Sequence, residues 1–183
     1  KTIKQLDLSS SNVGKVDFSK FEHLESLDLS CCNDLTAEQF NSIPNKASLI
    51  TLNLEQINVQ NFDLSGFTRL KSLILYGSKN LKAAQLSSIS LEAKASMEDL
   101  DLTFISLKNF KFSGFTGLKK ISLSYTEDLT AAQFNAISIK AKASIESLDL
   151  SNTVVTDFDF SGFIALKKLT LKETKNLTSA QFN

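Results

Sequence analysis

The sequence predicts an α/β solenoid in which eight short parallel strands form one sheet and a return segment follows each strand. First, the phrase L-x-x-L-x-L occurs eight times in 183 residues, with Ile or Met replacing some Leu residues. Second, apolar and mostly polar residues alternate in the second half of each phrase, as in a short strand with one buried face. A strand of this length cannot close a core alone, so we expect neighbouring repeats to stack.

Each strand with its return segment is called a rung below. The phrases begin at residues 3, 24, 49, 70, 97, 118, 145 and 166, so their spacings are 21, 25, 21, 27, 21, 27 and 21 residues. A short unit therefore alternates with a long one, which suggests duplication of a block of two rungs. We expect residues 1–183 to form a single domain of eight rungs. Because neither end carries the polar cap that normally closes a solenoid, we also expect truncation at both ends.

The long units carry the signature of a helix start after the strand. Thr36 suits the N-cap, Gln39 suits its reciprocal partner three residues on, and Leu35 and Phe40 suit a hydrophobic staple. In the second long unit Lys82 replaces the capping Thr, so we expect its helix to be less well capped. The full pattern recurs in Leu129, Thr130, Gln133 and Phe134, and in Leu177, Thr178, Gln181 and Phe182.

The short units have return segments that are too short for much helix. A Ser-Gly pair precedes the last Phe in three of them, at Gly66, Gly114 and Gly162, which predicts a tight extended or 3₁₀ turn. Thirteen of the 14 Phe residues occupy return-segment positions, which predicts a packed aromatic spine. The exception is Phe104.

The repeat of 21 to 27 residues with its single strand resembles the leucine-rich-repeat family, and the resemblance covers essentially the whole chain. It implies a right-handed superhelix with the parallel sheet on the concave face. The long units resemble the cysteine-containing leucine-rich repeats of F-box substrate receptors, with Cys32 at the family's Cys position. The short units resemble short bacterial-type repeats.

Composition excludes several classes of protein. With 20 basic and 20 acidic residues the chain has no net charge, which argues against a nucleic-acid partner because such binders usually carry a basic excess. The longest apolar run is far shorter than the roughly 20 residues that span a bilayer, so we expect no membrane insertion. The two Cys residues are adjacent, at positions 31 and 32, and give no disulfide framework. The compartment stays open.

The chain has few residues of the kinds that carry catalysis. His23 is the single His, and we interpret it as a solvated linker residue. Neither a P-loop, a G-x-G-x-x-G motif nor a G-x-S-x-G elbow occurs, and the Cys pair lacks a second pair at metal-ligand spacing. We therefore expect no enzyme activity, cofactor or metal. Cys32 is predicted to be a buried thiol beside an exposed Cys31, with redox sensing as the alternative.

One outward position of the repeat predicts a column of alternating charge. Opposite charges would lie side by side on neighbouring strands, which are roughly 4.8 Å apart. We interpret this column as a control of solubility and register. Its members, at the second phrase position, are Lys4, Glu25, Ile50, Lys71, Glu98, Lys119, Glu146 and Lys167.

A group of outward apolar side chains on three adjacent rungs predicts a partner-binding patch. The group is Ile74, Tyr76, Phe104 and Tyr125, and its charged rim is Asp99, Asp101, Lys119 and Lys120. Exposed aromatic residues rimmed by charge are typical of interaction hot spots. The alternative is that these rings only pack on one another.

These features favour a non-enzymatic protein–protein interaction scaffold that binds a partner through its concave strand face. A structural component of a larger assembly is one alternative. The substrate-receptor region of a ubiquitin-ligase-type complex is another, which the resemblance of the long units implies. Neighbouring repeat units or domains of the same chain are further possible partners.

Overall fold

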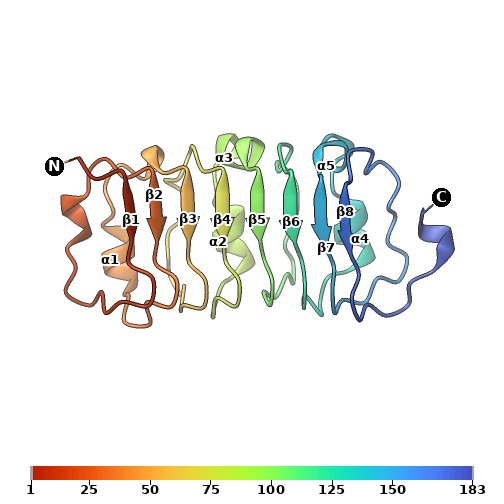
Figure 1. Ribbon diagram of the computed structural model, residues 1–183, viewed down its shortest axis with the longest axis horizontal. Coiled ribbons are helices and arrows are strands. Elements are labelled where there is room, and N and C mark those ends of the chain that lie inside the picture. The colour runs from red at the N-terminus through yellow and green to blue at the C-terminus, as the bar shows by residue number, and fades with distance from the viewer. Residues whose placement is uncertain (1, 183) are drawn as a thin grey trace.

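The computed structural model describes residues 2–182. Eight parallel strands form one sheet in which spatial order follows chain order, and the described chain runs from one end of the sheet to the other (Figure 1). The strands are β1 (Gln5–Asp7), β2 (Ser26–Asp28), β3 (Thr51–Asn53), β4 (Ser72–Ile74), β5 (Asp99–Asp101), β6 (Lys120–Ser122), β7 (Ser147–Asp149) and β8 (Lys168–Thr170).

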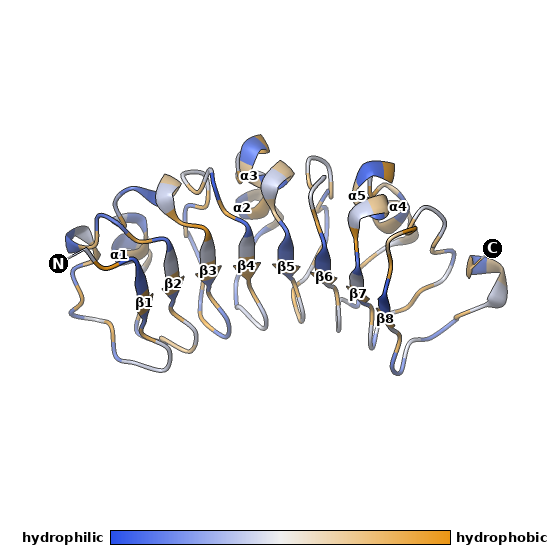
Figure 2. Ribbon diagram, turned by 45° about the horizontal axis from the view of Figure 1, so that its top comes forward, coloured by the Kyte–Doolittle hydropathy of each residue, from blue (hydrophilic) through white to orange (hydrophobic). Residues whose placement is uncertain are grey.

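Each strand occupies the third to fifth positions of its phrase, as the alternation predicts. The central residues pair with one another along the sheet without a register shift, from Leu6 and Leu27 in β1 and β2 to Leu148 and Leu169 in β7 and β8. From Leu27 to Leu148 these side chains are at most 1% exposed. The flanking positions point outward. Figure 2 shows the strands on the inner side of a shallow arc and the helices on its outer side.

The predicted helix starts are present in the long units, at α1 (Ala37–Asn41), α2 (Ala83–Ser87) and α4 (Ala131–Asn135). Thr36 and Gln39 form the reciprocal capping box. At α2 only half of the box forms. The Gln85 side chain accepts a hydrogen bond from the Lys82 N–H, but Lys82 has no acceptor with which to cap. In the last rung the return segment forms a 3₁₀ helix, η3 (Ser179–Phe182), in place of an α-helix.

Two further helices follow in the longest units and were not predicted from the sequence. They are α3 (Leu91–Ser96) and α5 (Ile139–Ser144), and their N-caps are Ser90 and Ser138. The first long unit is two residues shorter and has the 3₁₀ helix η2 (Lys46–Ser48) at this place. The short α-helix therefore occurs in the two units of 27 residues, and the 3₁₀ turn occurs in the unit of 25 residues.

The short units turn tightly, as predicted. The first contains the 3₁₀ helix η1 (Phe18–Lys20), whereas Gly114 and Gly162 have φ angles of +91° and +85°, which favour glycine. A second cause lies in the preceding long unit. A Cβ at Gly66 would lie 3.0 Å from the Lys46 Cδ, and one at Gly114 would lie 3.2 Å from the Lys94 Cδ. The glycines therefore make room for lysine stems.

The return segments meet in the predicted aromatic spine. Phe40 stacks on Phe62 with centroids 4.2 Å apart, and Phe134 stacks on Phe158 at 4.4 Å. Lysine ammonium groups lie over rings of the spine, such as Lys142 at 5.5 Å from the Phe163 centroid. The buried members are Phe18, Phe40, Phe62, Phe67, Phe110, Phe112, Phe115, Phe134, Phe158, Phe160 and Phe163. No helix within residues 2–182 combines the length and the apolar character that crossing a membrane requires.

Candidate functional site

A row of acidic side chains lines the concave face at the fifth phrase position, and it closes the turns that follow the strands. The Oδ1 atoms of Asp28, Asp101 and Asp149 accept the N–H of the residue two positions on, at 2.8 to 2.9 Å. Asn53 does the same at 3.0 Å. These Asx turns need an oxygen on a short side chain but no charge. The turns therefore do not require the negative charge of the Asp residues, since the neutral Asn53 closes the same turn.

In every rung the backbone is left-handed at the eighth phrase position, three residues beyond the fifth. All eight φ angles lie between +54° and +61°, and each of the first seven N–H groups donates to a carbonyl of the next rung. The turn therefore continues the ladder past the strand ends. Its left-handed residues are Ser10, Cys31, Gln56, Gly77, Phe104, Tyr125, Asn152 and Glu173.

Two of the left-handed positions are held by large aromatic residues. A bulky side chain at positive φ is uncommon and costs on the order of 1–2 kcal/mol, whereas glycine and asparagine are accommodated more readily. Phe104 and Tyr125 are nevertheless 49% and 42% exposed, so burial of the rings only partly offsets this strain. Strain of this kind clusters at functional sites.

The structure brings the predicted aromatic residues together. Phe104 stacks on Tyr125 with centroids 4.1 Å apart, and the edge of Tyr76 meets Phe104 at 5.6 Å. Ile74 is half-buried at the end of β4, in register with Asp101 of β5. We call Ile74, Tyr76, Phe104 and Tyr125 the aromatic patch. It lies at the carboxyl ends of three adjacent strands.

A hollow of about 400 Å³ adjoins the aromatic patch at Gly77. Gly77 places no side chain between Gln56 of the preceding rung and Phe104 of the following one, and a Cβ there would lie 3.5 Å from the Gln56 Cγ. The hollow thus has aromatic and polar walls. Its lining residues are Cys31, Asn33, Gln56, Tyr76, Gly77, Lys79 and Phe104.

The predicted charged rim divides into two parts. Asp101 borders the patch through its pairing with Ile74, and Asp99 and Lys120 face each other across β5 and β6, with Nζ and Oδ2 3.1 Å apart. The other oxygen of Asp99 is buried without a hydrogen-bond partner among residues 2–182. Lys119 lies at the amino end of β6, whereas the aromatic rings lie at the carboxyl ends of the strands. It belongs to the charged column instead.

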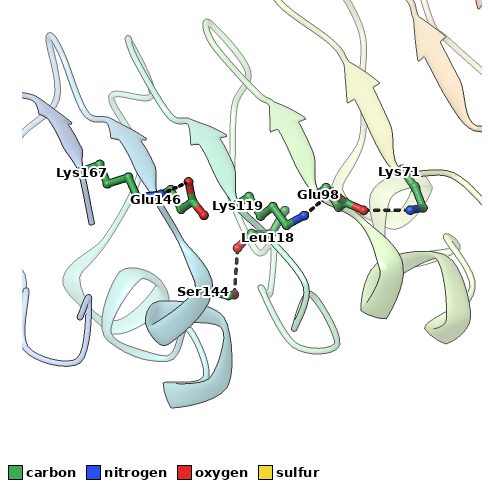
Figure 3. A network of polar contacts seen from close by, with 7 residues as sticks. All are labelled: Lys71, Glu98, Leu118, Lys119, Ser144, Glu146 and Lys167. Carbon is green, nitrogen blue, oxygen red and sulfur yellow. Dashed lines mark hydrogen bonds and ion pairs between the residues drawn. The ribbon is translucent and has the colours of Figure 1, made fainter. Parts of the chain in front are cut away.

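The charged column forms as predicted, and Figure 3 shows its part from Lys71 to Lys167. Glu98 lies between Lys71 and Lys119, with one carboxylate oxygen 2.9 Å from the first ammonium and the other 2.7 Å from the second. Glu146 pairs with Lys167 at 2.8 Å, and Lys4 pairs with Glu25 at 2.7 Å. Hydrogen bonds from Lys119 and Lys71 hold the pKa of Glu98 at about 2, well below its ordinary value of 4.5.

Because the pKa of Glu98 is lowered in the folded state, its ionised form stabilises the fold above pH 4.5. This contribution is lost as the pH falls towards 2. We expect wild type to lose more free energy of unfolding between pH 5 and 2 than Glu98→Gln, as measured by urea denaturation. Glu38→Gln, on the exposed surface of α1, is the control and should follow wild type. Equal acid sensitivity in wild type and Glu98→Gln would contradict this account.

The prediction for the cysteine pair is confirmed for Cys32, whereas Cys31 was predicted to be exposed and is half-buried. Cys32 is buried, its Sγ donates to the Leu8 carbonyl at 3.0 Å, and burial raises the pKa of the thiol. In other long units hydroxyl groups replace the buried thiol, as where Ser78 donates to the Leu54 carbonyl at 2.5 Å.

His23 is exposed, and the described residues contain no group of three His, Cys, Asp or Glu side chains that could hold a metal ion.

Comparison with known proteins places the fold. No family model matches the sequence, and no curated protein matches it. Among solved structures, the functional domain of InlJ from Listeria monocytogenes, which includes a cysteine ladder, superposes with a TM-score of 0.57 at 15% identity. A leucine-rich-repeat protein of Leptospira interrogans has a TM-score of 0.49 at 14% identity.

The alignments cover 96% and 94% of this chain, but only 46% and 61% of those two structures. This chain therefore spans about half the length of the InlJ domain. InlJ is a leucine-rich-repeat protein, and here too one parallel strand per repeat stacks in register, with short helices and 3₁₀ turns on the return side. The chain has the fold of a leucine-rich-repeat solenoid.

Proposed function

We propose that this chain is a non-enzymatic protein-recognition scaffold that binds its partner through the aromatic patch on the concave side. The observation that carries the proposal is the pair Phe104 and Tyr125. Both rings are held exposed on left-handed backbone, where glycine or asparagine would be less strained. The turn does not require aromatic side chains at this position, because the other six rungs have Ser10, Cys31, Gln56, Gly77, Asn152 and Glu173 there.

The geometry of the patch suits protein binding. Stacked and edge-to-face rings form a rigid apolar surface with few rotatable bonds, and aromatic residues dominate binding hot spots. The neighbouring hollow at Gly77 gives the surface a concave element into which one partner side chain fits. Asp101 supplies charge at the border, where polar groups fix orientation.

Replacing aromatic residues with those that other rungs use at the same position tests the proposal without disturbing the backbone. Phe104→Asn copies Asn152, and Tyr76→Ser copies Ser124 and Ser151. The partner is first isolated from the source cells with the full protein, and its affinity for each variant is then measured by calorimetry. We expect the double variant to bind at least about tenfold more weakly, because hot-spot rings contribute about 2 kcal/mol or more.

Stability serves as the control for these variants. Relief of left-handed strain offsets the lost ring contacts, so the free energy of unfolding should change by less than about 1 kcal/mol. Thr103→Ser, a small change at the buried residue before Phe104, should leave affinity unchanged. If the double variant binds the purified partner as tightly as wild type, the patch is not the binding site.

A further inference from the structure

The concave face is electrically asymmetric although the chain has no net charge. We consider the side chains at the third, fifth, seventh and eighth positions counted from each phrase start. In rungs 1 to 5 these positions hold acidic residues and no basic ones, whereas rungs 6 to 8 mix both signs. The acidic residues of the first part are Asp7, Asp28, Glu55, Asp99 and Asp101. In the second part the basic residues are Lys120, Lys168 and Lys172, and the acidic ones are Asp149 and Glu173.

Two of these acidic residues, Asp28 and Asp101, lie on either side of Ile74 at a defined spacing. Asp28, Asn53, Ile74 and Asp101 lie in one registered row across β2 to β5. Adjacent strands are about 4.8 Å apart, so the two carboxylates are about 14 Å apart along the row. An extended chain advances about 3.3 Å per residue and presents alternate side chains on one face, so its residues i and i+4 are about 13 Å apart.

Both carboxylates keep charge for a partner. One oxygen of Asp101 closes its turn, and the other has no hydrogen-bond partner within residues 2–182. Asp28 accepts from Ser30 and from the Asn53 amide, which are neutral groups and leave its charge in place. On the neighbouring strand β6, Lys120 is already paired with Asp99, with Nζ and Oδ2 3.1 Å apart.

We propose that the partner presents an extended basic segment that crosses the strands along this row. Two basic side chains four residues apart pair with Asp28 and Asp101, and an apolar side chain between them packs on Ile74 beside Tyr76. The proposal rests on the proposed function for its location. It adds the chemistry, direction and spacing of the bound segment.

Synthetic peptides test the spacing directly. The probe is a fluorescein-labelled peptide with the core Arg-Ser-Leu-Ser-Arg between Gly-Ser flanks, and its matched control has the core Arg-Arg-Ser-Leu-Ser. Binding to the full protein is followed by fluorescence anisotropy at about 0.05 and 0.5 M salt, because screening weakens exposed pairs. We expect the probe to bind about tenfold more tightly than the control peptide, and the higher salt to reduce that difference.

Matched variants of the protein test the two contacts. Asn53 closes the same turn that Asp28 and Asp101 close, so Asp28→Asn with Asp101→Asn removes charge and keeps the backbone. This double variant should bind the probe about tenfold more weakly. Asp149→Asn makes the same change outside the pair and should bind as wild type does.

Three results would overturn the proposal: no binding of the probe up to about 1 mM, equal binding of the two peptides, or an equal loss with Asp149→Asn. These outcomes are separable from failure of the proposed function. If Phe104→Asn with Tyr76→Ser weakens binding of the natural partner while the Asp double variant does not, the patch binds that partner without a basic segment. If neither double variant weakens binding of the natural partner, the aromatic patch is not the binding site.

Discussion

Replacing Phe134 with alanine is expected to lower the free energy of unfolding by about 3–5 kcal/mol, the range for a fully buried Phe. Phe134 is 0% exposed and connects three rings of the next rung. Its centroid lies 4.4 Å from that of Phe158, 5.4 Å from Phe160 and 5.7 Å from Phe163. Truncation therefore leaves a cavity in the spine between rungs 6 and 7, and the stacked neighbours cannot fill it.

The control for this variant comes from the chain itself. Leu86 occupies the equivalent place in α2, so Phe134→Leu should cost only about 1 kcal/mol. Urea denaturation measures the total loss, and hydrogen exchange locates it. Because each rung contacts only its neighbours, we expect rungs 6 to 8 to open first in the alanine variant. A loss below about 1 kcal/mol for alanine would contradict the role given to the spine.

Replacing Gln133 with leucine is expected to cost about 2–4 kcal/mol, because one amide serves two rungs. Its Oε1 accepts from the Thr130 N–H at 3.1 Å and so completes the capping box. Its Nε2 donates to the carbonyls of Leu107 and Phe110 in the preceding short unit, at 2.7 and 2.9 Å. Leucine leaves these partly buried carbonyls without a donor, and each unsatisfied group costs about 1–3 kcal/mol.

Two variants separate the capping contribution from the contacts between rungs. Thr130→Lys copies Lys82 at the start of α2 and should cost only about 1 kcal/mol, the usual value of a cap. Gln133→Glu keeps an acceptor for the cap but turns an oxygen towards the two carbonyls, so it should destabilise about as much as leucine. Thermal and urea unfolding measure both. If Gln133→Leu costs no more than Thr130→Lys, the amide acts only as a cap.

The regular parts of the fold could be predicted because the repeat overdetermines them. Eight copies of one phrase specify strand positions and register, since a shift of one residue would turn every buried Leu outward. The start of α1 followed from Thr36 and Gln39 because a capping box is a local signal. The sequence also indicated the weaker cap at Lys82, which the structure confirms.

The parts that escaped prediction depend on contacts between rungs. Ser90 and Ser138 cap α3 and α5, but the helices were hidden by their shortness and by the preceding helix of the same unit. Gln39 and Gln133 were interpreted as capping partners alone, because a side chain's second partner 26 residues away leaves no mark in the local sequence. The lysine stems over Gly66 and Gly114 escaped for the same reason.

The candidate site could be predicted in its composition but not in its conformation. The grouping of Tyr76, Phe104 and Tyr125 followed from register, and the rings do contact one another. The left-handed backbone under Phe104 did not follow, because an aromatic residue gives no sign of positive φ. A signal was present in only two of the other rungs, where Gly77 and Asn152 stand at the same position. Lys119 was assigned to the rim but lies before β6, away from the rings.

The charged column has a consequence for the aromatic patch. The ion pairs of Glu98 with Lys71 and Lys119 link three adjacent rungs at the amino ends of β4, β5 and β6. The same three rungs carry Tyr76, Phe104 and Tyr125 beyond the carboxyl ends of these strands. Binding normally loses affinity when loops must be ordered on contact. For the binding proposed above, this loss of conformational entropy would occur during folding, because the ion pairs already hold the three rungs together.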